Sequence, residues 1–109
     1  MTRGDIVVVA TRGAYTSKPR PALVVQDNSF NETHGSVTLC PITSDCIDAP
    51  LFRIALPPGE RTSLQVSSQV MVDKIVSVPR EAITRSIGHC SAAELLAVDD
   101  ALRRWLGLN

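Results

Sequence analysis

The sequence predicts a mainly β protein that ends in one α-helix. Short runs rich in β-branched residues, separated by turns of Gly, Pro, Asn and Asp, occupy most of the chain and indicate strands. After Ser91 the apolar spacing changes to that of a helix, which then continues almost to the end. Strands followed by one amphipathic helix favour a small barrel, or a curled antiparallel sheet, with the helix packed against it.

The first three predicted strands are the most apolar. Residues 6–9 form a β-branched run that follows Gly4, and residues 22–25 form a second run that Pro21 introduces at the strand entry. Residues 37–42 form a third strand with apolar side chains on both faces.

Two further strands are predicted before the helix. Residues 52–56 form the fourth and end at a Pro-Pro-Gly turn. Residues 69–78 form the fifth, with Val70 and Val72 on one face and Asp73 on the other.

The helix has a clear beginning and a clear end. Ser91 and Glu94 have the spacing of a capping box, and Gly107 is placed to terminate the helix. One face carries four apolar residues at helical spacing: Leu95, Val98, Leu102 and Trp105. We expect Trp105 to be packed in the core.

Composition sets the class of protein. A length of 109 residues with 44% hydrophobic and 20% charged residues predicts one folded domain spanning residues 1–109. Eleven basic residues balance eleven acidic ones, which argues against nucleic-acid binding by bulk charge but leaves a local basic pocket possible. No apolar stretch is long enough to form a signal segment or to span a membrane, so we expect a cytoplasmic protein with no membrane partner.

Metal and thiol chemistry are not expected. Three cysteines without a CxxC pair fit a reducing compartment, and each is interpreted as a small buried hydrophobe. His34 and His89 have no Cys or His partner at ligand spacing, so we predict no metal site and no other cofactor.

Lys18-Pro19-Arg20-Pro21 is the strongest candidate for binding an anion. Two rigid prolines hold two cations close together at a strand entry, and the planar guanidinium of Arg20 can bind phosphate oxygens bidentately. A solvated pair of loop charges is the alternative interpretation.

Two other segments carry polar side chains where strands end or turn outward. The hydroxyls of Thr43 and Ser44 can donate to a phosphate, although such residues commonly bond nearby backbone in a turn. Asp73 and Lys74 interrupt an apolar strand, either as an outward-facing charged edge or as groups that line a cleft.

Taken in order, four segments resemble one known family. RGDIVVV at 3–9, KPRPALVV at 18–25, CPITS at 40–44 and VDKI at 72–75 are similar to motifs of the MazF/PemK (Kid) toxins of type II toxin–antitoxin systems. The resemblance spans essentially the whole chain. It implies the CcdB/MazF/Kid toxin fold, an SH3-like barrel with a C-terminal helix.

The resemblance also implies an activity. Members are metal-independent, sequence-selective endoribonucleases that cut single-stranded RNA (mRNA, tRNA or rRNA). The RNA's own 2′-hydroxyl attacks the phosphorus and leaves 2′,3′-cyclic phosphate and 5′-hydroxyl ends. Implied partners are the single-stranded RNA substrate, a cognate antitoxin that inhibits the enzyme, a second copy in a homodimer, and operator DNA only through the antitoxin complex.

By match to the family motifs, three residues are implied to be catalytic. Arg20 corresponds to the arginine that stabilises the phosphate and is a candidate proton donor to the leaving 5′-oxygen. Thr43 corresponds to a hydroxyl donor to the same phosphate. Asp73 corresponds to an acidic position that some members use as a base or for base contacts, but Met71 stands where one branch has a second arginine.

The loop before Arg20 lacks the His-Glu pair that some members carry, so Asp73 is the leading candidate for the general base, with the substrate or solvent as the alternative. Specificity is expected mainly in loops 12–19 and 27–35. Tyr15 and Phe30 in these loops are candidates to stack on unpaired bases, with packing against the barrel as the alternative. The remaining RNA-binding candidates are charged or hydroxylated residues beside the catalytic ones: Lys18, Ser44 and Lys74.

Two other functions share the predicted fold. A CcdB-like poison of DNA gyrase uses a C-terminal Trp-Gly-Ile, which Trp105-Leu106-Gly107-Leu108 resembles only superficially. A catalytically degenerate module would keep antitoxin and DNA contacts without cleavage. The absent His-Glu pair and Met71 favour that module, whereas Arg20 and Thr43 count against it.

Overall fold

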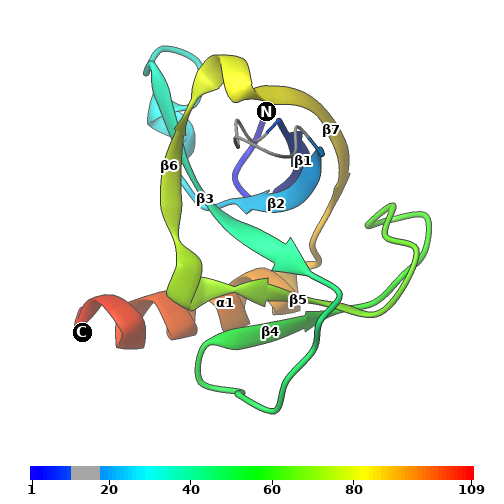
Figure 1. Ribbon diagram of the computed structural model, residues 1–109. Helices are drawn as coiled ribbons and strands as arrows, with labels where there is room; N and C mark the ends of the chain where they lie inside the picture. Colours follow the sequence, from blue (N-terminus) through cyan, green and yellow to red (C-terminus); the bar gives the residue numbers. More distant parts are fainter. Residues whose placement is uncertain (11–17) are drawn as a thin grey trace.

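The computed structural model describes residues 1–10 and 18–109. The strands found in the described residues are, in chain order, β1 (Asp5–Val9), β2 (Arg20–Val24), β3 (Ser36–Thr43), β4 (Arg53–Leu56), β5 (Ser68–Met71), β6 (Val76–Pro79) and β7 (Ile83–His89). Short 3-10 turns lie between strands: η1 (Asn28–Phe30), η2 (Val72–Lys74) and η3 (Arg80–Ala82). The helix α1 (Ala92–Leu106) ends the fold (Figure 1).

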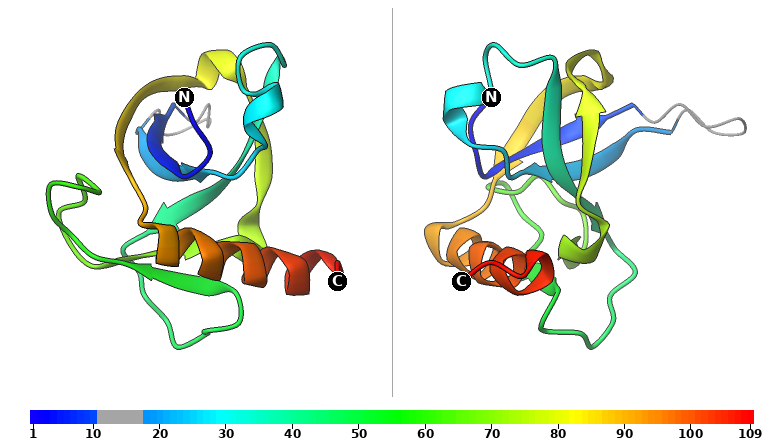
Figure 2. Two further views of the ribbon diagram at one scale, coloured as in Figure 1. Left: turned by 180° about the vertical axis from the view of Figure 1, so that it is seen from behind. Right: turned by 90° about the vertical axis from the view of Figure 1, so that its left-hand side faces the viewer.

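The strands pair antiparallel around the long strand β3. Its first half pairs with β6, its second half pairs with β5, and its other edge pairs with β2. The order β4-β5-β3-β2-β1-β7 completes the sheet, with β6 beside β3. The sheet curls so that β1 and β2 lie enclosed between β6 and β7, while β4 and β5 lie near α1 at one end (Figures 1 and 2).

Alternate residues of the central strands enter two different cores. Ile6 and Leu23 face a core that also contains Val98 of α1. Val7 and Val24 face the opposite core, which β6 and β7 cover. Because both faces are buried, these strands have continuous apolar runs rather than apolar–polar alternation. The third strand has apolar residues on both faces, as predicted, and residues from Val37 to Ile42 contribute to both cores.

The helix begins and ends as predicted. The Ser91 hydroxyl accepts from the Glu94 amide at 3.1 Å, and the Glu94 carboxylate accepts from the Ser91 amide at 2.7 Å. Gly107 has a φ of 71°, the left-handed conformation that glycine adopts easily at a helix end. The helix lies along β4 and β5 (Figure 2), with Val98 and Ala101 fully buried.

The prediction of one strand at 69–78 was wrong. The 3-10 turn η2 interrupts it, so that β5 pairs with β4 and the end of β3, while β6 pairs with the start of β3. The charged pair Asp73-Lys74 lies at this break. Val70 and Val72 are both buried in the same core, as predicted.

Strand β7 was missed. Its sequence, ITRSIGH, is polar and partly exposed, and it pairs along one edge with β1 with two register shifts. A strand held by one neighbour needs little apolar alternation, so it leaves a weak signal.

Two burial predictions need correction. Trp105 is 50% exposed and covers the rim of the core through a tilted contact with the Phe52 ring, with centroids 5.9 Å apart. Cys40 and Cys90 are buried free thiols as expected, but Cys46 is exposed. Among the helices in the described part of the chain, none has the length and apolarity to cross a membrane.

Candidate functional site

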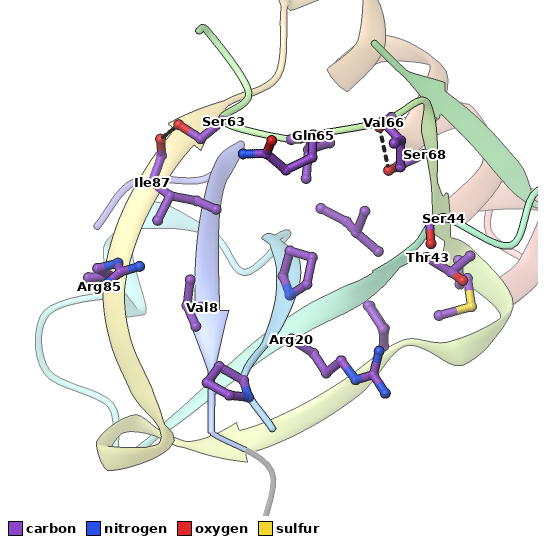
Figure 3. A pocket seen from close by; sticks show the side chains of 16 residues that line it. Val8, Arg20, Thr43, Ser44, Ser63, Gln65, Val66, Ser68, Arg85 and Ile87 are labelled. Carbon is purple, nitrogen blue, oxygen red and sulfur yellow. Dashed lines mark hydrogen bonds between the residues drawn. The ribbon is translucent and has the colours of Figure 1, made fainter. Parts of the chain in front are cut away.

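A cavity of about 650 Å³ opens where β2, the end of β3 and β7 approach the β4–β5 loop (residues 57–67). Its size lies in the range typical of ligand sites. Most of its described wall is apolar, with polar side chains at a few points (Figure 3). The polar and charged lining residues are Arg20, Thr43, Ser44, Ser63, Gln65, Ser68 and Arg85.

Two arginines give this cavity its charge. Arg20 begins β2 and Arg85 lies on β7, and Figure 3 shows them on two sides of the cavity with Val8 between them. Both are exposed, and within the described residues neither side chain makes a hydrogen bond or an ion pair. The described lining contains no carboxylate. Two unneutralised guanidiniums around one cavity favour an anionic ligand, and phosphates fit their planar donor geometry.

Thr43 and Ser44 lie at the cavity rim where β3 ends. The Thr43 Oγ1 atom accepts a hydrogen bond from the Asp45 amide at 3.0 Å, which fixes the half-buried side chain. Because this bond uses a lone pair, the hydroxyl proton stays available for a ligand. The predicted turn-type hydrogen bond is therefore present and compatible with the predicted donor role. Ser44 is exposed beside it.

The other RNA-binding candidates lie around or away from this cavity. Lys18 is exposed, and the chain passes from it through Pro19, which lines the cavity, to Arg20. Phe30 is 55% exposed on η1, and no residue of loop 27–35 lines the cavity. Tyr15, like most of loop 12–19, lies outside the described residues.

Asp73 is not brought to the cavity. It lies on η2, its side chain is 14% exposed, and its Oδ1 atom is 3.9 Å from the Arg53 Nε. The Lys74 ammonium is 3.8 Å from the other carboxylate oxygen and is largely exposed. The neighbouring Met71 lines the cavity instead. The structure thus assembles Arg20, Thr43 and Ser44 but leaves Asp73 and Lys74 in a separate ion-pair cluster with Arg53.

Sequence reasoning missed Arg85 and the β4–β5 loop. Arg85 belongs to the strand that was not predicted, and the loop was interpreted only as a turn. No local motif marks either of them. Arg85 reaches the cavity because β7 pairs antiparallel with β1, with Val8 opposite Arg85. Knowledge of the β1–β7 register would therefore have been needed to predict that Arg85 lines the cavity.

The buried thiols have no sign of nucleophilic activation. Burial raises the pKa of Cys40 to about 12, and burial also raises the pKa of Cys90. A thiol that stays protonated is a poor nucleophile. No cluster of His, Cys, Asp or Glu with metal-site geometry occurs in the described part of the chain.

Comparison with known proteins gives consistent matches over the whole chain. Residues 2–106 match the family described as PemK-like, MazF-like toxin of type II toxin-antitoxin system. A probable endoribonuclease MazF of Mycolicibacterium smegmatis is 44% identical over 108 residues, covering 99% of this chain and 98% of the relative. Endoribonuclease MazF9 of Mycobacterium tuberculosis is 35% identical over 116 residues, covering 99% of this chain and 98% of the relative.

A solved structure also matches closely. MazE-MazF from Deinococcus radiodurans contains a chain that superimposes with a TM-score of 0.84 at 27% identity, covering 100% of this chain and 98% of that one. These matches confirm the resemblance that the four motifs indicated and the barrel-with-helix fold it implied.

Proposed function

The chain belongs to the PemK-like, MazF-like toxin family of type II toxin–antitoxin systems and is an endoribonuclease, and from this premise we propose that it cleaves single-stranded RNA in the cavity between Arg20 and Arg85. The supporting observation is that two guanidiniums without carboxylate partners face one cavity. Such a site suits a phosphodiester backbone. Its apolar walls suit the faces of unpaired bases.

The RNA supplies its own nucleophile in this reaction, so the protein needs mainly to stabilise the negative charge that develops on the phosphate. The RNA 2′-oxygen bonds to the adjacent phosphorus, and the bond from phosphorus to the 5′-oxygen breaks. One proton leaves the 2′-hydroxyl and one reaches the 5′-oxygen, which gives a cyclic phosphate and a 5′-hydroxyl. Arg20 and the Thr43 hydroxyl, on neighbouring strands of the same rim, would donate to the phosphate oxygens as negative charge builds up.

The cavity lining also bears on which group accepts the proton of the 2′-hydroxyl. The described lining offers no carboxylate, and Asp73 is engaged with Arg53 outside the cavity. Arginine keeps its proton in proteins, so Arg20 is better suited to stabilise charge than to transfer a proton. We therefore assign proton acceptance to solvent or substrate rather than to Asp73.

The same cavity is proposed to explain inhibition by a cognate antitoxin. The matched Deinococcus radiodurans structure is of MazE-MazF, and an acidic antitoxin segment would neutralise Arg20 and Arg85. Operator DNA would then be bound through the antitoxin complex alone, because this chain has balanced charge. An RNA substrate and an antitoxin partner support a cytoplasmic location.

A homodimer is the proposed assembly. Leu51, Trp105 and Leu106 expose 63%, 50% and 51% of their surface, and Trp105 packs on Phe52 next to Leu51. An exposed apolar patch of this kind favours association. Sedimentation of the purified chain should give a dimer mass.

The test is cleavage of a long single-stranded RNA in the presence of EDTA, with the cut ends mapped. We expect cleavage at short sequences with cyclic-phosphate and 5′-hydroxyl ends. Arg20→Ala should lower the rate at least about a hundredfold, the usual effect of losing a donor to a developing oxyanion. Arg103→Ala is the matched control, because Arg103 pairs with Asp100 on α1.

Intact RNA with the wild-type protein would refute the proposed function. An Arg20→Ala variant that cuts at the parental rate would remove Arg20 from the mechanism while leaving the nuclease activity in place.

A further inference from the structure

The β4–β5 loop supplies one wall of the cavity. Ser63, Leu64, Gln65 and Val66 from this loop line it, and Figure 3 shows Gln65 on the wall across from Arg20. Gln65 is exposed, and its side-chain amide makes no hydrogen bond within the described residues. The side-chain amide lies between Leu64 and Val66 in the chain and presents a donor NH₂ group and an acceptor oxygen to a ligand in the cavity.

The loop is fixed to β7 by close backbone contact. A Cβ at Gly88 would lie 2.4 Å from the Arg61 carbonyl oxygen and 2.7 Å from the Thr62 carbonyl group, so only glycine allows this approach. The His89 amide donates to the same Arg61 carbonyl at 3.0 Å. The loop therefore rests on the backbone of the strand that carries Arg85.

A second attachment joins the loop to the helix. The Arg61 guanidinium binds both carboxylate oxygens of Glu94, at 2.8 and 3.0 Å, and Glu94 is the capping-box residue of α1. Arg61 also donates to the His89 carbonyl at 3.0 Å. These bonds hold the loop in one position relative to the sheet.

The loop is also held together internally. Thr62 is buried, and its hydroxyl donates to the Pro57 carbonyl at 2.7 Å. Ser63 has a φ of 61° and its amide donates to Gly59 at 2.8 Å, while its hydroxyl donates to the Ile87 carbonyl on β7. A recognition residue needs a rigid support, because geometry fixed in advance lowers the cost of binding and sharpens selection.

From this arrangement we propose that Gln65 is a specificity-determining residue that reads a nucleobase beside the cleaved bond. The inference rests on the proposed function, since it takes the cavity as the RNA site. Arg20 and Thr43 hold the phosphate at one wall, so the neighbouring base extends toward the wall that carries Gln65. A glutamine amide pairs bidentately with adenine through its N6 and N7 atoms, which makes adenine the expected base.

The experiment compares sequence preference rather than activity alone. An RNA library randomised over the cut region is digested by the wild type, Gln65→Ala, Gln65→Glu and the control Ser67→Ala, and the cut sites are sequenced. Ser67 is exposed on the same loop but does not line the cavity. Equal melting temperatures establish that the variants are folded.

The expected wild-type result is a preference of about tenfold or more for adenine at one position next to the cut, since one bidentate contact contributes about 1–3 kcal/mol of discrimination. Gln65→Ala should flatten that position alone. Gln65→Glu, which only accepts hydrogen bonds, should shift it toward cytosine through the N4 amino group. Ser67→Ala should retain the wild-type preference.

An unchanged preference in both Gln65 variants would overturn the inference while leaving the nuclease intact. If the wild type does not cut, the proposed function fails, and the same sequences are then measured as binding to uncleavable 2′-deoxy oligonucleotides. A preference lost in Gln65→Ala would still support base reading by Gln65. Equal binding of all sequences by the wild type would refute it.

Discussion

Glu94 has two roles: it caps the start of α1, and it binds Arg61 of the β4–β5 loop. Two replacements of Glu94 separate these roles. Its carboxylate accepts from the Ser91 amide at 2.7 Å within the capping box and binds Arg61 bidentately at 2.8 and 3.0 Å. Glu94→Gln keeps an acceptor for the cap but removes the charge that binds Arg61. Glu94→Ala removes both.

The expected costs follow from the exposure of the pair. The Arg61 side chain is 34% exposed and that of Glu94 is 17% exposed, which lies between a surface ion pair and a buried one. Surface pairs contribute up to about 1 kcal/mol and hydrogen bonds to charged groups about 1.5–3 kcal/mol, so Glu94→Gln should cost about 1 kcal/mol of unfolding free energy. Loss of the acceptor for the Ser91 amide adds about 1 kcal/mol, the usual contribution of one hydrogen bond, so Glu94→Ala should cost about 2 kcal/mol.

The pH dependence distinguishes charge from packing. Burial opposes ionisation of Glu94, but hydrogen bonds from Arg61 and Ser91 outweigh it, so the pKa of this carboxyl lies below its ordinary value of 4.5. A lowered pKa in the folded state stabilises the protein above the ordinary value, and the stabilisation is lost as pH falls through the folded pKa. The difference between the wild type and Glu94→Gln should therefore shrink as pH falls below about 4.5.

The assay is urea unfolding of the wild type and both variants at neutral and acidic pH. Asp100→Asn is the control, because Asp100 forms an ion pair with Arg103 but its side chain is 63% exposed. We expect this control to change stability by less than about 0.5 kcal/mol. Equal stability of Glu94→Gln and wild type at neutral pH, or a difference that persists undiminished at acidic pH, would refute the reasoning.

Three further predictions concern the cavity. Thr43→Val keeps the side-chain volume but removes the hydroxyl, so we expect RNA cleavage to slow by about tenfold or more while RNA binding changes little, measured as single-turnover rates and affinities. Arg85→Ala should weaken binding of single-stranded RNA evenly across sequences and reduce the salt slope of log affinity by about 0.7, the value for one phosphate contact. Asp73→Asn should leave the pH–rate profile unchanged, because Asp73 lies outside the cavity; a lost acidic limb would restore it as the base.

The parts of the fold that could be predicted are those with strong local signals. The runs IVVV and ALVV predict two strands, and β1 and β2 confirm them, with residues of both strands in each of the two cores. The capping box at Ser91 and the glycine at 107 fixed the limits of the helix to within a residue. These features depend only on neighbours in the chain, so a single sequence is enough to find them.

The parts that could not be predicted depend on pairing between distant segments. Strand β5 ends where β3 changes partners, and nothing local to Val72 reveals that change. Trp105 has helical spacing with the core residues, but α1 extends past the sheet there and leaves it half exposed (Figure 2). The motifs indicated Arg20 and Thr43 as candidates, and both line the cavity, whereas Arg85 and Gln65 reach it only through the register of β7 and the docking of the β4–β5 loop.

The net charge of the sequence does not reveal that two arginines and no described carboxylate line the cavity. With eleven basic and eleven acidic residues, the chain has no surplus to attract RNA over long distances. Four acidic residues form ion pairs with arginines that do not line the cavity: Arg3–Asp99, Arg53–Asp73, Arg61–Glu94 and Arg103–Asp100. No carboxylate is among the described residues that line the cavity, so the charges of Arg20 and Arg85 are not neutralised there by an ion pair. RNA binding should then depend on a few local phosphate contacts, and the base contact proposed for Gln65 would decide where the RNA is cut.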